Sequence, residues 1–148
     1  DEIAATQQAT VLDKIVRPCR FRILEDHIFR QSNPAVVGVE VLAGTLTNNR
    51  AVVRFDGMEP DRVGTLSGIQ HQGEDVESVR AGAEVSVAID GPTVGRQIDE
   101  GDELWVELPE AHAKVLELEL ADDIPGDELE ALTQYLQRQR RREPFWAR

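Results

Sequence analysis

The chain has 148 residues, of which 41% are hydrophobic, so it is long enough for one domain with a real core and is not disordered throughout. Its 28 acidic and 16 basic residues give a net charge of −12. No apolar run approaches the roughly 18 residues of a membrane span, and residues 1–16 lack the pattern of a signal peptide. Because the first residue is Asp1 and not Met, we expect a piece of a longer protein.

The residue types that build metal centres and catalytic sites are sparse. Cys19 is the single cysteine, and His27, His71 and His112 have no close spacing, so a structural metal is not expected. The sequence contains no phosphate-binding glycine loop and no nucleophile elbow. Acidic pairs such as Asp122-Asp123 are typical of solvated surface. Catalysis within this chain and a bound cofactor therefore have no sequence support.

The charge is unusual in kind and in distribution. Only two of the 16 basic residues are lysines, and excess carboxylate with so little lysine is typical of proteins from salt-loving archaea, although a simply acidic protein would also fit. Residues 74–130 carry 18 acids and three bases, a net charge of −15. Two basic segments flank this stretch, with net charges of +3 in residues 17–54 and +4 in residues 131–148. These segments either contact phosphates or neutralise the acidic stretch within the fold.

Three segments follow one another along the chain. Residues 1–16 lack Gly and Pro and carry a short apolar stripe, which predicts the end of a linker helix. Residues 17–108 hold short Val-, Ile- and Leu-rich runs separated by turn residues, which predicts a mainly β, closed antiparallel barrel. The expected strands are 20–24, 27–30, 35–42, 50–55, 63–70, 84–89 and 103–107, with a hairpin tip at 47–49.

Residues 109–148 are expected to hold two helices. Residues 109–120 fit a helix or a strand from their pattern alone. In the following helix Leu129, Leu132 and Leu136 share one face, Asp127 and Glu130 form a capping-box-like pair, and arginines close the last turn. Phe145 and Trp146 come after it and either cover the helices or floor a groove for a partner.

Arg96 stands out within the acidic stretch because glycine precedes it in a turn-rich loop. An arginine placed there can reach a phosphate or a carboxylate with both arms of its guanidinium group. An internal ion pair with Asp99, Glu100 or Asp102 is the alternative.

Several strings occur in the order found in one family. They are IFRQSNPAVVGV at 28–39, VLAGTL at 41–46, VGTLSGIQ at 63–70, AIDGPTVGRQI at 88–98, GDEL at 101–104 and PFW at 144–146. From about residue 15 to the end, the chain resembles the C-terminal region of the translation initiation factor of the archaeal and eukaryotic five-B type. Bacterial initiation factor two is its counterpart.

The resemblance implies a fold and a function. It implies a translation-factor-type barrel over 17–108 that holds the methionylated acceptor end of initiator tRNA, and it favours helix for 109–120. It implies a helical pair over 109–148 that docks initiation factor one-A and supports joining of the ribosomal subunits. We expect tRNA contacts at Gly95, Arg96 and Gln97, with Asn48 and Asn49 of the hairpin tip beside them. The residues expected to bind the partner factor are Leu129, Leu132, Tyr135, Leu136, Arg138, Arg141 and Trp146.

The family also sets what this chain is not expected to do. GTP and Mg²⁺ are expected on a GTPase domain that this chain lacks, so the chain itself is expected to be neither an enzyme nor a cofactor carrier. We expect a cytoplasmic, monomeric fragment with no membrane contact. A protein-docking module that binds no tRNA by itself is the alternative function.

The charge leads to a test of stability. Self-repulsion among the acids of residues 74–130 should weaken the fold when it is poorly screened. Thermal melts in about 0.1 M and about 2 M KCl should therefore show a higher midpoint in the concentrated salt. An unchanged midpoint would contradict adaptation of this fold to a saline cytoplasm.

Overall fold

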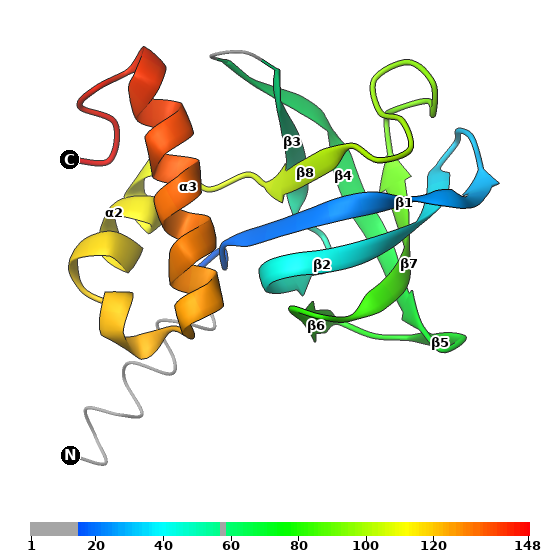
Figure 1. The fold of residues 1–148 in the computed structure, drawn as a ribbon, viewed down its shortest axis with the longest axis horizontal. Coiled ribbons are helices and arrows are strands. Elements are labelled where there is room, and N and C mark those ends of the chain that lie inside the picture. The colour runs from blue at the N-terminus through cyan, green and yellow to red at the C-terminus, as the bar shows by residue number, and fades with distance from the viewer. Residues whose placement is uncertain (1–14, 57–58) are drawn as a thin grey trace.

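The computed structural model describes residues 15–56 and 59–148, with side chains described outside residues 56–61. An antiparallel barrel and two C-terminal helices fill these ranges, which confirms the expected fold class (Figure 1). The linker helix expected over residues 1–16 falls on residues 1–14, outside the described ranges.

The strands follow the order β1-β8-β3-β4-β7-β2, and pairing of β2 with β1 closes the barrel. Their bounds are β1 (Cys19–Arg30), β2 (Ala35–Thr47), β3 (Ala51–Asp56), β4 (Glu59–His71), β7 (Glu84–Asp90) and β8 (Glu103–Val106). Short strands β5 (Glu74–Asp75) and β6 (Ser78–Arg80) pair with β4 and β2. Alternating residues such as Val85, Val87 and Ile89 point into the barrel core, which explains the clean period of two in β7.

The first strand is longer than its sequence pattern suggests. The expected strands 20–24 and 27–30 are one element, β1, whose register against β2 shifts between Ile23 and Ile28. Asp26 has a φ of 60° inside this bulge. Phe21 and Ile23 point into the core before the bulge, whereas Ile28 packs against the core after it. Because the bulge changes the phase of the alternation, the sequence reads as two short strands.

The second strand continues past its expected end at Leu42 to Thr47. Gly44, with a φ of 90°, lets this happen, because a Cβ atom there would lie 2.0 Å from the carbonyl oxygen of Pro18. The backbone N–H of Thr45 donates to that same oxygen over 3.1 Å. In the sequence Gly44 resembles a turn, but in the structure it marks a close approach of two backbones.

The turn at Asn48 and Asn49 forms as expected, but it is not a hairpin tip. Strands β2 and β3 are not neighbours in the barrel, so the turn carries the chain across one end of it. Asn49 has a φ of 62°, which Asn tolerates. A turn signal in a sequence does not tell whether the strands on either side pair with each other.

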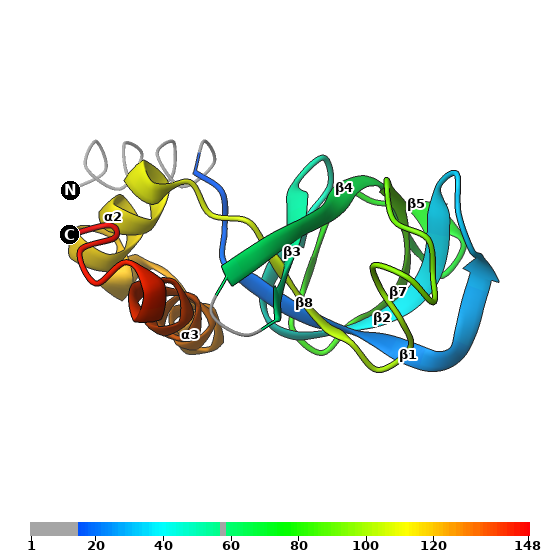
Figure 2. The same ribbon diagram turned by 90° about the horizontal axis from the view of Figure 1, so that it is seen from above.

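Two helices and a short 3₁₀ turn cover the outside of the barrel on one side (Figures 1 and 2). They are α2 (Glu110–Leu118), η1 (Ala121–Asp123) and α3 (Gly126–Arg142). Val53 and Trp105, on the outer face of β3 and β8, join Leu116, Leu132 and Leu136 in a second hydrophobic core. Amphipathic helices thus bury an apolar part of the barrel exterior.

The expected capping box at Asp127 and Glu130 does not form. Helix α3 begins at Gly126 after Pro125, and no side chain caps it. The Asp127 carboxylate instead accepts a hydrogen bond from the backbone N–H of Gly44 over 2.8 Å and pairs with Arg80 over 2.9 Å. Contacts with the barrel, invisible in local spacing, take this carboxylate away from its own helix.

Glu128 joins the helix to the barrel at the same point. Its carboxylate is completely buried and accepts two hydrogen bonds from the Arg17 guanidinium, at 2.8 and 2.6 Å. Arg80 approaches it to 3.6 Å. We call Arg17, Arg80, Asp127 and Glu128 the junction cluster.

The close approach at Gly44 can be tested against a matched glycine. Gly44→Ala adds a Cβ that collides with Pro18 and should lower the free energy of unfolding, measured in denaturant, by about 3 kcal/mol or more. Gly82 has a similar φ of 94° but open space around a Cβ, so Gly82→Ala should cost about 1–2 kcal/mol for the backbone conformation alone. Equal losses in the two variants would show that the contact with Pro18 matters little.

Candidate functional site

A pocket of about 340 Å³ opens on the outer face of the barrel, where β1, β2, β7 and β4 lie side by side. Gly38 pairs with Ser86, and Ser86 pairs with Gln70, so one row of outward positions crosses the pocket. We call it the barrel pocket; it is lined by Leu24, His27, Phe29, Gly38, Gln70, Gln72, Gly73, Glu84, Val85 and Ser86.

Gly38 makes room for this pocket. A Cβ atom on Gly38 would lie 2.7 Å from the Cβ of His27, so only a residue without a side chain lets His27 lie over β2. The Nδ1 atom of His27 donates to the carbonyl oxygen of Glu25 over 2.6 Å, which orients the ring. Phe29, two residues further, is 63% exposed, a large value for an aromatic side chain.

The pocket combines apolar and amide surface. Leu24 and Phe29 supply the apolar part, and Gln70 and Gln72 supply amides. The Nε2 atom of Gln70 donates to Asp75 over 3.1 Å, which holds its amide across the edge of the sheet. This site is not among those predicted from the sequence, although a lone glycine at an outward strand position was a usable signal.

Gly95, Arg96 and Gln97 lie together in the loop after β7, and all three are exposed. The neighbouring Val94 N–H donates to the carbonyl oxygen of Gln31 over 2.9 Å, and the Gln97 amide oxygen accepts from the Thr93 N–H over 2.9 Å. We call residues 93–97 the rim loop. It packs beside the end of β1, two residues beyond Phe29.

Arg96 has no ion pair with any residue that the structure describes. Of its expected alternative partners, Asp102 pairs with Arg54 over 3.2 Å and also accepts from the Asp99 N–H. The Arg96 guanidinium is therefore open to solvent and to a ligand.

Asn48 and Asn49 do not lie beside the rim loop, which corrects the sequence-based expectation. Ala35 pairs with Ile89, so the start of β2 and the loop after β7 share one end of the barrel. The asparagines follow the last residue of the 13-residue strand β2 and lie at the opposite end. There the Asn48 N–H donates to the carbonyl oxygen of Glu77 over 2.8 Å.

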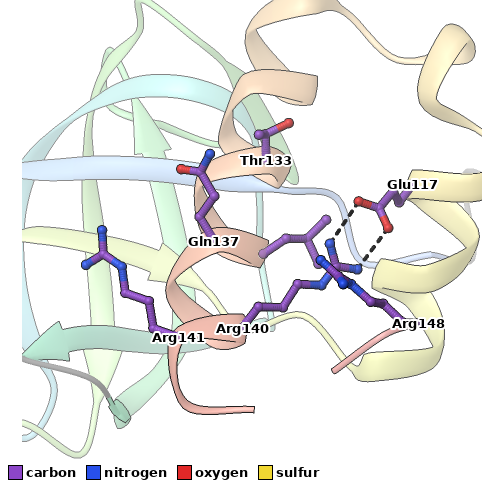
Figure 3. Close-up of a pocket in the computed structure, with 7 residues that line it drawn as sticks. Glu117, Thr133, Gln137, Arg140, Arg141 and Arg148 are labelled. Atoms are coloured by element: carbon purple, nitrogen blue, oxygen red, sulfur yellow. Dashed lines mark hydrogen bonds and ion pairs between the residues drawn. The ribbon is translucent and has the colours of Figure 1, made fainter. Parts of the chain in front are cut away.

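A groove of about 510 Å³ lies between α2 and α3. Figure 3 shows Arg140 and Arg148 on the side of Glu117, while Arg141 points away from it. The Arg140 guanidinium binds both oxygens of Glu117, at 3.1 and 2.9 Å. These hydrogen bonds lower the pKa of Glu117 and raise that of Arg140. We call this the helix groove; it is lined by Glu117, Thr133, Leu136, Gln137, Arg140, Arg141 and Arg148.

The residues expected to bind the partner factor are divided by the fold. Leu132, Tyr135 and Leu136 are buried in the second core, where the Tyr135 hydroxyl accepts from the Leu108 N–H over 3.2 Å. Burial raises the pKa of Tyr135. Leu129 and Trp146 are half-buried against the same core.

Of the expected set, Leu136 and Arg141 line the helix groove, whereas Arg138 lies over the rings of Phe55 and Trp105. Thr133, Gln137 and Arg140, which also line it, were missing from the expected set. Their spacing of four and three residues on one polar helix face was the available signal.

Four of the eleven arginines in the two basic segments form ion pairs with acids within the fold, so charge neutralisation accounts for a part of these segments. The ion pairs are Arg17–Glu128, Arg22–Glu40, Arg54–Asp102 and Arg140–Glu117. Two arginines, Arg20 and Arg138, stack on Trp105 instead.

Among residues 15–56 and 59–148, no group of three or more His, Cys, Asp or Glu side chains could hold a metal ion. Burial raises the pKa of the Cys19 thiol, and the nearby Glu128 carboxylate raises it further. No helix in the described part of the chain is long and apolar enough to cross a membrane.

The closed barrel with an exposed rim and an outer pocket belongs to a known class of translation-factor domains. Residues 17–105 match the family described as Elongation factor Tu domain 4, and the chain belongs to this family.

Similar proteins narrow the assignment. The chain is 72% identical over its full length to a probable translation initiation factor IF-2 of Haloquadratum walsbyi and 65% identical over 99% of its length to that of Natronomonas pharaonis. It spans about a quarter of each, 24% of their length. It also resembles the crystal structure of GDP-bound aIF5B from Aeropyrum pernix, with 32% identity, a TM-score of 0.87, and coverage of 99% of this chain and 24% of that one. The expected resemblance to the C-terminal region of the archaeal IF-2/5B factor is confirmed.

Proposed function

We propose that this chain is the part of an archaeal initiation factor that recognises the methionylated acceptor end of initiator tRNA. The barrel pocket is the observation that carries the proposal, because it pairs an exposed aromatic ring with amide groups in one recess. The relatives are translation initiation factors, which act on the ribosome, so the ligand that the factor must recognise is an aminoacyl ester at the end of an RNA.

The barrel pocket fits methionine chemically. Leu24 and Phe29 offer apolar surface to a flexible thioether side chain, and sulfur–aromatic contacts are favourable by about 0.3–1.5 kcal/mol. The amides of Gln70 and Gln72 can donate to the ester carbonyl and accept from ribose hydroxyls. Phe29 offers a face on which the terminal base can stack.

The rim loop supplies the backbone contact in this proposal. Arg96 is exposed and unpaired among the described residues, and a guanidinium group binds phosphate with two parallel hydrogen bonds. Gly95 and Gln97 keep the loop backbone open around it. Because concentrated salt screens long-range attraction, such short-range bonds would have to select the RNA.

Catalysis lies outside this proposal. The relatives are about four times longer than this chain, which covers 24% of their length, and the similar aIF5B structure has GDP bound. We propose that GTP, Mg²⁺ and GTP hydrolysis belong to another part of the factor. The chain itself would contribute to subunit joining by binding, within the cytoplasm.

Two substitutions test tRNA recognition. Phe29→Ala should weaken binding of methionylated initiator tRNA by about 1–3 kcal/mol, through loss of stacking and side-chain contact. Arg96→Ala should weaken it by about 1.5–3 kcal/mol, the range for a charge-assisted hydrogen bond. Titrations with methionylated and deacylated tRNA separate the two roles, because Phe29→Ala should reduce the preference for methionine and Arg96→Ala should not.

Both residues are exposed, so the melting midpoint should hold in each variant. Arg62→Ala removes an exposed arginine that pairs with Glu107 on another face, and it serves as the control. If the wild-type chain shows no preference for methionylated tRNA, the proposal fails, and a pure docking module becomes the better description.

A second function rests on the helix groove. We propose that it binds a segment of initiation factor one-A. The groove places an apolar floor at Leu136 beside Arg140, Arg141 and Arg148, which suits an acidic segment with apolar side chains. Leu132 and Tyr135 would act by holding α3 in place and not by touching the partner.

Surface variants test this docking better than removal of α3, which would expose the second core. Arg141→Glu combined with Gln137→Glu should reduce binding of the one-A factor at least tenfold, measured by calorimetry, through like-charge repulsion. Lys114→Glu, on an exposed position of α2 outside the groove lining, is the matched control and should bind normally. Equal binding by all three proteins would exclude the helix groove as the docking site.

A further inference from the structure

Trp105 is held between arginines from opposite ends of the chain. The guanidinium carbon of Arg20, on β1, lies 5.8 Å from the centre of the indole ring, and that of Arg138, on α3, lies 5.7 Å from it. Trp105 itself is 3% exposed, and the rings of Phe55 and Tyr135 also lie against it, with ring centres 5.9 and 6.3 Å away. Arg138 also lies 5.8 Å from the ring centre of Phe55.

These two arginines differ from the ion-paired arginines of their segments. Neither has a carboxylate partner among the described residues, whereas Arg17, Arg22 and Arg140 do. The Nε atom of Arg20 is buried without a hydrogen-bond partner. In a chain with a net charge of −12, two guanidinium groups without carboxylates are not explained by charge neutralisation.

A polar recess of about 540 Å³ lies next to this stack. Phe55 lines the recess and also lies under Arg138, so the stack and the recess are continuous. Arg22 and Arg54 line it as well, together with Asp102 and Glu103. We call Arg20, Arg22, Arg54 and Arg138 the arginine face.

The arginine face brings the two basic segments together. Arg20, Arg22 and Arg54 come from residues 17–54, and Arg138 comes from residues 131–148, with the acidic stretch between them in the sequence. Helix α3 lies beside the strands β1, β8 and β3 that carry this surface (Figures 1 and 2). The barrel pocket shares β1 with this surface but lies at and beyond the bulge, towards β2, β7 and β4, so the two surfaces can be occupied separately.

We propose that the arginine face binds the sugar-phosphate backbone of RNA at a site distinct from the acceptor-end site. Guanidinium groups stacked on rings keep their in-plane N–H groups free and oriented, which is the arrangement that binds phosphate oxygens with two hydrogen bonds. Arginine is also weakly hydrated, so such bonds persist where salt screens attraction.

RNA fits this face better than an acidic protein segment does. Its phosphates are regularly spaced and carry single charges, which matches arginines spread over a strand and a helix. Asp102 and Glu103 at the recess would repel clustered carboxylates, whereas ribose hydroxyls can donate hydrogen bonds to them.

The test uses the 148-residue chain and an RNA hairpin of about 20 nucleotides that carries no aminoacyl group. The double variant Arg20→Gln, Arg138→Gln keeps side chains of similar length over Trp105 but removes both charges. Its affinity should fall at least tenfold. The slope of log K against log salt concentration should become shallower by about 0.9 for each lost phosphate contact.

Controls separate this site from the proposed tRNA site. Phe29→Ala and Arg62→Gln should leave hairpin binding and its salt slope unchanged, because neither residue belongs to the arginine face. Loss of hairpin binding in Phe29→Ala would show that the RNA occupies the barrel pocket and would overturn the second site. If Phe29→Ala lacks an effect on methionylated tRNA as well, the proposed tRNA site fails while the arginine face stands.

A second variant serves as the control for a loss of stability. Arg20→Lys, Arg138→Lys keeps both charges but not the planar fork, and it should bind the hairpin more weakly than wild type and better than the glutamine variant. Melting midpoints followed by Trp105 fluorescence confirm folding. Unchanged affinity and slope in the folded glutamine variant would overturn the proposal, as would binding of polyglutamate by this face without binding of the hairpin.

Discussion

The arrangement of this molecule depends on the buried carboxylate of Glu128. It sits at the first turn of α3, is completely enclosed, and is bound by Arg17 from the segment that leads into β1. Replacing one partner of such a pair leaves a buried charge, which typically costs about 3–5 kcal/mol. Asp127 adds a bond to the backbone of Gly44, so the start of α3 is fixed to two strands at once.

The direction of α3 follows from that attachment. Fixed at its first turn, the helix packs against β1 and β2 and buries Trp105 and Tyr135 between itself and the barrel. The aromatic rings meet edge to face, with centres 5.2 Å apart for Phe55 and Tyr135 and 5.9 Å apart for Phe55 and Trp105. Helix α3 contributes residues to the helix groove and Arg138 to the arginine face. The junction cluster fixes the first turn of α3 and therefore helps to position both surfaces.

The barrel and the helices could be predicted from the sequence because their signals are local. Alternation in β7 and the leucine spacing of α3 each reflect one buried face, and the fold agrees with both. Features that depend on residues far away in the sequence could not be predicted. Asp127 resembles a helix cap until Gly44 and Arg80 are placed beside it, and Asn48 resembles a hairpin tip until the strand order is known.

The candidate sites show the same division. Arg96 could be singled out because it follows a glycine in a turn-rich loop of the acidic stretch. The barrel pocket was missed although Gly38 was a signal, because that glycine gains its meaning from the side chain of His27 on a neighbouring strand. Likewise, Arg20 and Arg138 are 118 positions apart in the numbering, and only the packing of α3 on β8 brings them to one ring.

The bulge in β1 has a consequence for the barrel pocket. Before the bulge, the odd-numbered Phe21 and Ile23 point inward and the even-numbered Arg22 points outward. After it, Phe29 points outward and Ile28 packs inward, so the strand has exchanged its faces. Strand β1 thereby contributes even-numbered residues to one outer surface and odd-numbered residues to another. Without the bulge, the strand would turn Phe29 into the barrel interior and Ile28 out to solvent, so the pocket owes its aromatic side chain to a local irregularity in the pairing.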